Sequence, residues 1–402
     1  MTHPLPLAPL LPALDAPRYL DEQRRLYGRR PVLLLPGDAP REVLAALDLL
    51  PVEVWGGGEE PAVPRCPRLP PFVCSLAQRQ LQRLLAAATE SVAAVVLPGL
   101  CDTQQGLGSL LAEALGPSLP VLTYDPGISV WSPRGGAAPE PVAEALDPFR
   151  KAELELFVQA CEGIAGRKLQ PERLATELRL QEEAQRLALA LYRRRAGLVL
   201  GERPFGELLR TREFLTTADW LRRLQDAQAL VVQASGSLPA RRPVLLSGIA
   251  PEPMELLDLV EAAGLTVVGD DLLCLGRRWT VRARAAQCPE GRELAGRAQL
   301  LRELAALPPA PTRTGGGVSR ASWLLAEVHR SEAQGVLVLV PRCCEPELCG
   351  VPELTASLAR ARVPLLVVEH EPGAPLAGDL ATRLTAFAGL LSAAGCPGGG
   401  GP

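Results

Sequence analysis

The sequence predicts an α/β protein with two Rossmann-like parallel-sheet lobes, related by internal duplication, and a helical segment between them. Short apolar runs alternate with helical patterns in residues 30–126, and the alternation returns over residues 243–370. Such alternation is typical of parallel sheets covered by helices. The stretch from Arg30 to Gly56 also parallels the stretch from Arg242 to Gly269. A duplicated βαβ plan predicts two facing lobes that bind a ligand between their strand ends.

Eight apolar runs are expected to form the strands because they are short and bounded by Pro, Gly or polar residues. In the first lobe these runs are residues 31–35, 52–55, 93–98 and 120–124, and in the second lobe 243–248, 265–271, 335–341 and 364–370. Helical patterns near residues 40–49, 77–89 and 104–115 separate the strands of the first lobe. A helix that ends near Leu391 closes the second lobe.

Composition divides the chain into five segments. They are an N-terminal extension (1–29), a first α/β lobe (30–147), a helical segment (148–238), a second α/β lobe (239–393) and a disordered tail (394–402). Residues 127–147 are rich in Pro and Gly and are interpreted as a linker. The helical segment has apolar residues every three to four positions, as amphipathic helices do. The Gly-rich tail lacks the apolar residues that a packed core requires.

Composition also excludes several classes of function. The net charge of −3 argues against a partner that is a nucleic acid or an anionic membrane surface. The sequence has no run of about 18 apolar residues, so no membrane span is predicted. The N-terminus lacks the basic region of a signal peptide. We therefore expect a cytoplasmic protein, whose ten cysteines serve as thiols, metal ligands or redox groups. The absence of a GxxxxGK[ST] loop predicts that the chain does not hydrolyse ATP itself.

Cysteines at matching positions of the two halves are the strongest indication of a site. VVLPGLCD ends with Cys101 and an acid, and LVLVPRCCE ends with Cys344 and an acid, each after a predicted strand. Cys74 opens a predicted helix. Helix N-termini stabilise thiolates and anionic clusters because unpaired backbone N–H groups point there. Three thiolates from Cys74, Cys101 and Cys344 would suit an iron–sulfur cluster, while spacing alone leaves zinc open without a CxxC pair to favour it.

Polar residues at other strand ends allow two interpretations. Asp270 and Asp271 could bind a cation, and the following Arg277 and Arg278 could bind an anion, or the four could form a local ion pair at a turn. His370 could act as an acid or base, although a solvated loop histidine is the plainer interpretation. For Cys161, Cys288 and Cys396 we expect buried, unreactive thiols.

The order and spacing of several motifs resemble the 2-hydroxyacyl-CoA dehydratase and benzoyl-CoA reductase subunit family. The resemblance runs from about Arg30 to Leu391. The motifs are VLPGLCDTQQ at 96–105, SGIAPEP at 247–253, VVGDDLLCLGRR at 267–278, the CEP segment at 344–346 and DLATRLTAFAGLL at 379–391. Two departures from the family pattern concern the last cysteine: Cys343 doubles it, and Glu345 follows it in place of aspartate. The matching proline-to-cysteine steps favour Cys344 over Cys343.

The resemblance implies a cytoplasmic enzyme subunit, either a 2-hydroxyacyl-CoA dehydratase-like lyase or an ATP-dependent reductase. In that family three cysteines, carried over here to Cys74, Cys101 and Cys344, hold a [4Fe–4S] cluster. The implied partners are a separate ATP-hydrolysing iron–sulfur activator protein, which supplies a low-potential electron, and a paralogous subunit or a second copy of the chain. The implied substrate is an acyl-CoA thioester that reacts as a radical.

Two alternatives within the resemblance stay open. Cys66, Cys274 and Cys349 could add three thiolates to the first three, and six would suit the [8Fe–9S] double cubane of a related branch of homodimeric reductases that act on small molecules. The other alternative is a non-catalytic cluster-binding scaffold that has kept the fold. The resemblance gives no substrate identity and no proton-transfer residue.

Overall fold

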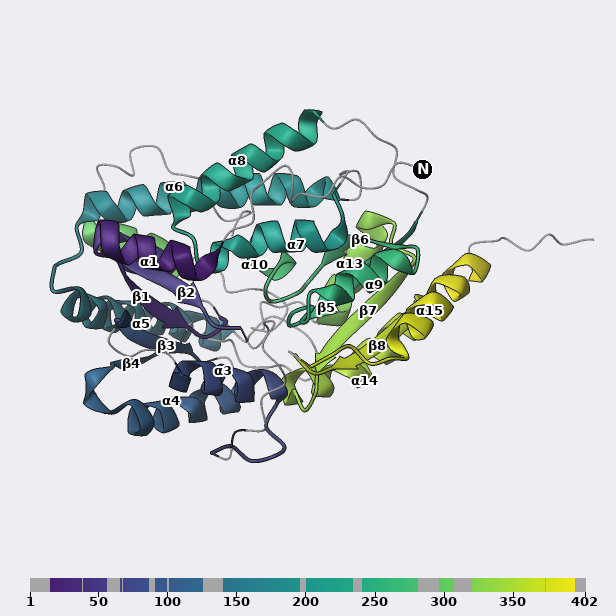
Figure 1. Ribbon diagram of the computed structural model, residues 1–402, viewed down its shortest axis with the longest axis horizontal. Coiled ribbons are helices and arrows are strands. Elements are labelled where there is room, and N and C mark those ends of the chain that lie inside the picture. The colour runs from purple at the N-terminus through teal and green to yellow at the C-terminus, as the bar shows by residue number, and fades with distance from the viewer. Residues whose placement is uncertain are drawn as a thin grey trace, which may run out of the picture.

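The computed structural model contains two four-stranded sheets, and all neighbouring strands in each are parallel (Figure 1). The structure describes residues 15–37, 39–55, 66, 68–86, 91–99, 101–125, 140–195, 200–233, 241–280, 296–306, 320–372 and 374–394. The first sheet contains β1 (Arg30–Leu34), β2 (Leu49–Glu53), β3 (Ala94–Pro98) and β4 (Val121–Tyr124), and the second contains β5 (Arg242–Gly248), β6 (Leu265–Asp270), β7 (Gly335–Pro341) and β8 (Leu365–His370). A strand occurs at each of the eight predicted places, although β2 begins three residues before the predicted run 52–55 and ends two residues before its end.

The strand order is the same in both sheets. The first runs β2-β1-β3-β4 and the second runs β6-β5-β7-β8, with every neighbouring pair parallel. The predicted fold class, with its internal duplication, is therefore confirmed. Because β3 and β7 hold the same place in their sheets, the loops that follow them lie at equivalent strand ends.

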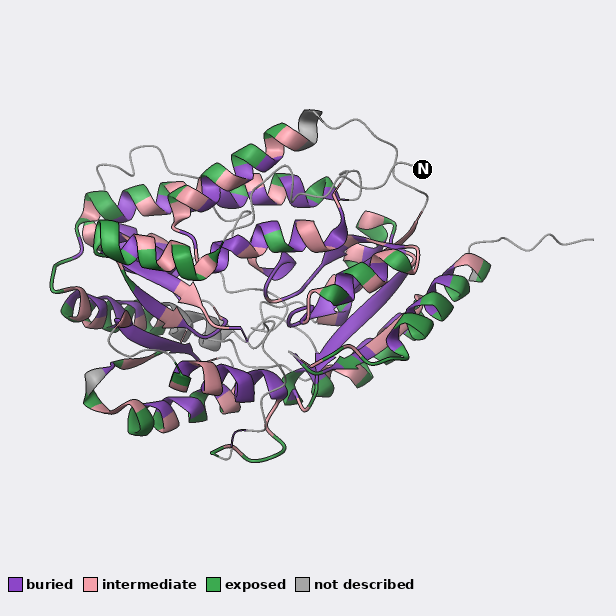
Figure 2. Ribbon diagram, in the orientation of Figure 1, coloured by how far each residue is buried: buried purple, intermediate pink, exposed green. Residues whose placement is uncertain are grey.

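Helices cover both faces of each sheet, and this explains why the strands read as continuous apolar runs. Along the first sheet, Val32, Leu34 and Val96 pack on one face, while Val95 and Leu97 pack on the other. The second sheet repeats the alternation, and its central strand β7 is buried along its whole length. Figure 2 shows the buried strands and the exposed outer faces of the helices around them.

The helices follow the chain order of the predicted segments. Around the first sheet lie α2 (Arg41–Ala46), α3 (Ser75–Ala86), α4 (Asp102–Leu115) and the 3₁₀ turn η2 (Gly116–Ser118), and the middle of the chain contains α5 (Glu140–Ala165), α6 (Pro171–Arg193), α7 (Glu202–Arg210), the 3₁₀ turn η4 (Thr211–Glu213) and α8 (Thr217–Gln233). The later helices are α9 (Glu255–Ala262), α10 (Gly276–Thr280), α12 (Arg297–Ala306), α13 (Arg320–Ser331), α14 (Glu345–Arg360) and α15 (Leu380–Ala394).

Two helices differ from the sequence-based interpretation. Helix α5 begins at Glu140, inside the segment 127–147 that was interpreted as a linker, so that interpretation is wrong for its last part. Helix α12 comes from the sequence of the second lobe, but its Leu300, Leu301 and Leu304 pack into the core of the first. Residues 126–139, Cys288, Cys396 and the predicted tail from 395 lie outside the described residues.

The N-terminal extension contains helix α1 (Ala16–Tyr27), whose first turn is capped by the Asp15 carboxylate. The helix is attached to the middle of the chain, because the Tyr19 hydroxyl donates a 2.6 Å hydrogen bond to Asp219 of α8. Among the described residues, no helix combines the length and the apolar character needed to cross a lipid bilayer.

Candidate functional site

Cys74, Cys101 and Cys344 each stand immediately before a helix, as predicted. Cys101 and Cys344 are the N-cap residues of α4 and α14, both with extended backbone, and Cys74 precedes the first residue of α3. Their carbonyl groups accept the first helical hydrogen bonds, for example from Leu348 N to Cys344 O at 2.9 Å. All three cysteines therefore stand at helix N-termini, where unpaired backbone N–H groups favour negative charge.

The structure brings these three cysteines together from both lobes. The thiols of Cys74 and Cys344 form a hydrogen bond, and Cys101 lies close enough to repel a thiolate at Cys74. A backbone hydrogen bond of 3.2 Å from Ser75 N to Arg342 O joins the two lobes at the same point. In Figure 1 the N-terminal end of α3 meets α14 here.

A thiolate at Cys74 is disfavoured unless a cation or a metal group binds. The hydrogen bond with Cys344 raises the pKa of Cys74 well above its ordinary value, and burial and the proximity of Cys101 add to this effect. Bound iron would offset this repulsion among thiolates, so the donor set fits a group of positive metal ions. No three His, Cys, Asp or Glu side chains of the described residues are spaced to hold a single ion.

The turn after β7 determines which of two adjacent cysteines enters this group. Cys343 has a left-handed backbone with φ of 59°, and the next residue, Cys344, donates its N–H to Pro341 O at 2.9 Å. This tight turn places the buried Cys344 beside Cys74. Of the two cysteines, Cys344 forms the hydrogen bond with Cys74, and its role as a ligand stays a prediction.

The further cysteines lie in different surroundings. Cys66 is buried in the first-lobe core with Leu81 and Leu107. Cys274 is fully buried beside Arg210, and burial raises the pKa of its thiol. Cys349 is exposed on α14. Cys161 is a buried core thiol, as expected, and burial raises its pKa to about 12.

Asp270 and Asp271 are buried parts of the fold. Asp270 accepts hydrogen bonds from the backbone of Leu272 and Gly276 and pairs with Arg195 at 2.8 Å. Asp271 accepts a hydrogen bond from Gly248 N at 3.1 Å. Although burial acts to raise the pKa of Asp271, Arg320 and Arg277 lower it below its ordinary value. The local ion pair is thus confirmed for Arg277, which lies 3.5 Å from the Asp271 carboxylate.

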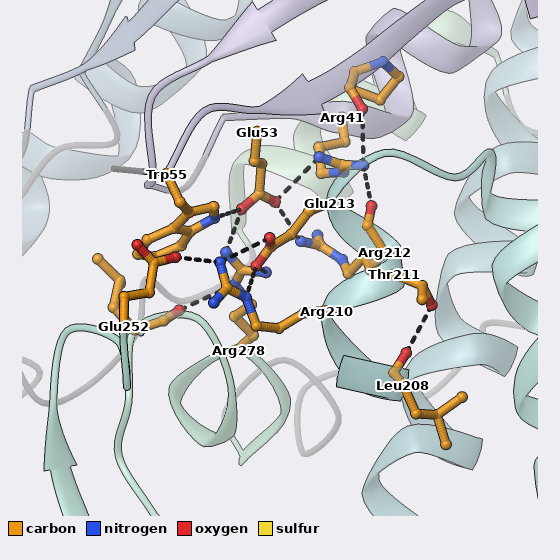
Figure 3. Close-up of polar contacts among 12 residues, drawn as sticks. Arg41, Glu53, Trp55, Leu208, Arg210, Thr211, Arg212, Glu213, Glu252 and Arg278 are labelled. Carbon is orange, nitrogen blue, oxygen red and sulfur yellow. Dashed lines mark hydrogen bonds and ion pairs between the residues drawn. The ribbon is translucent and has the colours of Figure 1, made fainter. Parts of the chain in front are cut away.

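Arg278 does not join this pair but reaches across to Glu53 of the first lobe. Glu53 also binds Arg41 and Arg212, at 3.1 Å and 3.0 Å (Figure 3). The indole N–H of Trp55 donates to the same carboxylate at 3.1 Å. Sequence reasoning missed this network. Glu53 could have been recognised as a candidate from its position, because it is the last residue of β2 just as Asp270 is the last residue of β6.

His370 is buried, so the interpretation as a solvated loop residue is wrong. The residue ends β8 with its side chain on the inner face, as Val368 does, and only 7% of it is exposed. Its Nδ1 lies 2.8 Å from the Glu252 carbonyl oxygen, and a carbonyl only accepts, so Nδ1 carries the proton. His370 lines a cavity of about 260 Å³ together with Arg342 and Arg383.

Comparison with known proteins places these features in a family. The model of the 2-hydroxyglutaryl-CoA dehydratase D-component family matches residues 37–391. The chain is 20% identical to the (R)-phenyllactyl-CoA dehydratase beta subunit of Clostridium sporogenes over 93% of this chain and 95% of that protein. It is 21% identical to the lactoyl-CoA dehydratase beta subunit of Anaerotignum propionicum, over 94% and 96%.

A reductase is similar to the same degree. One of the subunits of benzoyl-CoA reductase from Thauera aromatica is 22% identical over 85% of this chain and 86% of that protein. The match of the family model spans both lobes and includes all three converging cysteines. The chain therefore belongs to the 2-hydroxyglutaryl-CoA dehydratase D-component family, and it is an enzyme subunit of the dehydratase type.

Proposed function

We propose that the chain is the iron–sulfur subunit of an enzyme of the 2-hydroxyacyl-CoA dehydratase or benzoyl-CoA reductase type, with a [4Fe–4S] cluster held by Cys74, Cys101 and Cys344. The observation that carries the proposal is the convergence of these three thiols at three helix N-termini. When bound, the cluster supplies one-electron chemistry: it accepts a low-potential electron and passes it to an acyl-CoA thioester.

The residues of this chain contribute charge stabilisation and shielding. Cys74, Cys101 and Cys344 stand at the starts of α3, α4 and α14, where unpaired backbone N–H groups would stabilise the negative charge that three thiolates and inorganic sulfide bring. Cys344 is only 6% exposed and Cys74 is partly buried, which limits the access of water. Because Cys101 and Cys344 come from different lobes, the relative position of the lobes determines whether the site is complete.

The proposed partners are an ATP-hydrolysing iron–sulfur activator and a second subunit, either a paralogue or another copy of this chain. The sequence has no phosphate-binding GxxxxGK[ST] loop of its own, which supports a separate ATPase. Three of the relatives are named beta subunits. Phe72, two residues before Cys74, is 74% exposed, and Leu348, four residues after Cys344, is 44% exposed. These apolar side chains beside the cysteines support a partner contact there.

Iron and acid-labile sulfide, measured per chain after anaerobic purification, test the proposal. We expect about four iron atoms in the wild type, as one cubane requires. Cys344→Ser should lose most of this iron because it removes one of three ligands. The matched control is Cys349→Ser, on the same helix, which should keep the wild-type content because its thiol is exposed to solvent.

Three outcomes would contradict the assignment or change it. Full iron retention in Cys344→Ser, with loss in Cys343→Ser, would transfer the ligand role to the neighbouring residue. About eight irons per chain would instead favour the bridged double cubane, with Cys66, Cys274 and Cys349 as further ligands. A chain that binds its cluster but supports no thioester reduction or dehydration with activator and partner would be a non-catalytic scaffold.

A further inference from the structure

Arg320 is a largely buried cation that connects three elements of the second lobe. It begins α13, and its side chain is only 12% exposed. Its Nε donates to Ser247 Oγ at 3.0 Å, near the end of β5, and lies 3.3 Å from the Asp271 carboxylate. Its Nη1 donates to the Glu347 carboxylate at 2.7 Å. The guanidinium group thus links the ends of β5 and β6 to helix α14.

The link to α14 holds the turn of the helix that carries Cys344. Cys344 is the N-cap of this helix, and Glu347, its third residue, is fully buried. Since Leu348 N is hydrogen-bonded to Cys344 O, the cysteine and the glutamate belong to one rigid turn. A side chain that fixes Glu347 therefore also fixes the direction of the Cys344 thiol.

The same guanidinium places a positive charge near the sulfur atom. Burial lowers the pKa of Arg320, whereas Asp271 and the nearby Cys344 act to raise it. Arg277, behind Asp271, is 2% exposed, and its Nε and Nη1 have no hydrogen-bond partner among the described residues. Arg277 and Arg320 thus pair with two carboxylates, Asp271 and Glu347. These four side chains together have no net charge until a thiolate or an anionic cluster binds beside them.

We propose that Arg320 is a positioning residue for the cluster: it orients Cys344 through Glu347, and its charge raises the reduction potential of the bound cluster. The inference rests on the proposed function. A positive charge near a cluster favours the state with one more electron, and hydrogen bonding and charge around the sulfur atoms are known determinants of such potentials. Arg320 would thereby make the cluster easier for an activator to reduce.

The experiment compares variants of the full chain after anaerobic reconstitution. Iron per chain and the midpoint potential, followed by EPR during a redox titration, are measured for the wild type, Arg320→Gln and Arg320→Lys. Arg330→Gln is the matched control, because Arg330 lies on the same helix in an exposed ion pair with Glu327. We expect a more negative midpoint potential in Arg320→Gln, a near wild-type potential in Arg320→Lys, and no change in Arg330→Gln.

If Arg320→Gln keeps the wild-type iron content and the wild-type midpoint potential, this inference is overturned and the proposed function is not. A shift in Arg320→Lys as large as that in Arg320→Gln would overturn the role of the charge. If Arg320→Gln does not fold, Glu347→Gln serves as the test variant. Removal of this negative charge should move the midpoint potential of the cluster in the positive direction. An unchanged potential would refute the proposal. A wild-type chain without iron would instead overturn the proposed function, and this inference with it.

Discussion

His370 is a buried imidazole whose protonation opposes folding. Burial lowers its pKa below the ordinary value near 6.5, and this exceeds the raising effects of the Glu252 carbonyl and carboxylate. The folded chain therefore takes up the proton at lower pH than the unfolded chain does. The contribution of the neutral ring to stability is fully present above about pH 6.5 and is lost as the pH falls toward the folded-state pKa.

Replacement of His370 by Gln should therefore flatten the pH dependence of stability. Between pH 6.5 and 5 the wild type should lose free energy of unfolding faster than the variant, by at most about 1.4 kcal/mol per pH unit. Urea unfolding at several pH values measures the difference. Parallel curves for the two proteins would show that His370 does not titrate in this range.

At the scale of the element, the end of β5 must contain glycine. Gly248 has a positive φ of 140°, and a Cβ atom there would overlap the carbonyl oxygen of Leu339 in β7. The Gly248 backbone N–H donates to Asp271, and its carbonyl accepts from Arg277. The packing of two central strands thus also shapes the polar network near Cys344.

We predict that Gly248→Ala lowers the free energy of unfolding by about 3 kcal/mol or more, because backbone strain and a steric clash add. Gly264→Ala is the control, since Gly264 also has positive φ, at 79°, but open space where its Cβ would lie. It should cost only about 1 kcal/mol, the strain alone. If denaturant unfolding shows that Gly248→Ala and Gly264→Ala lose equal free energies of unfolding, the predicted clash at Gly248 is contradicted.

The strands could be predicted because buried parallel strands leave a strong local signal, a short run of apolar residues with a breaker at each end. Periodicity also predicted helices of the first lobe, of the middle segment and at the end of the second lobe, but it does not say against which surface a helix packs. The residues of α12 were placed in the second lobe because they follow its first strands in sequence, although Leu300 and Leu304 complete the first-lobe core. The start of α5 at Glu140 was missed because Pro and Gly dominate the residues just before it.

At the scale of the whole molecule, Glu53 holds three parts of the chain together. It ends β2 in the first lobe, while Arg212 comes from the helical segment and Arg278 from the second lobe. The guanidinium groups of Arg210 and Arg278 also lie 5.4 Å and 5.3 Å from the centre of the Trp55 ring (Figure 3). Burial would raise the pKa of Glu53, but the surrounding arginines lower it to about 2.

We predict that Glu53→Gln destabilises the protein by about 3–5 kcal/mol, because it leaves buried arginines without their carboxylate. In the wild type the stabilisation is present above pH 4.5 and is lost as the pH falls from 4.5 toward 2. Asp48→Asn is the control, since Asp48 pairs with Arg167 and Arg173 at the surface and should cost less than about 1 kcal/mol. Thermal unfolding near neutral pH should separate the two variants clearly, and similar losses would contradict the role of burial.

The site could be predicted only where its signal is local. Cys101 and Cys344 stand beside buried strands and at matching positions, so each could be recognised from its immediate neighbours. Partners in the Glu53 network lie far apart in sequence, and the separation from Arg278 is 225 residues. No periodicity connects such positions, and only the packing of the lobes brings them together.

The common strand order of the two lobes has a consequence for the history of the protein. Cys101 and Cys344 follow equivalent strands, so a single-lobe ancestor that paired with its own copy would have presented the two thiols across a twofold axis. The helices before these strands differ between the lobes: α3 begins just after Cys74, whereas α13 begins with Arg320. One chain with two similar lobes can thus carry different residues at equivalent positions, which a symmetric dimer of identical lobes could not do.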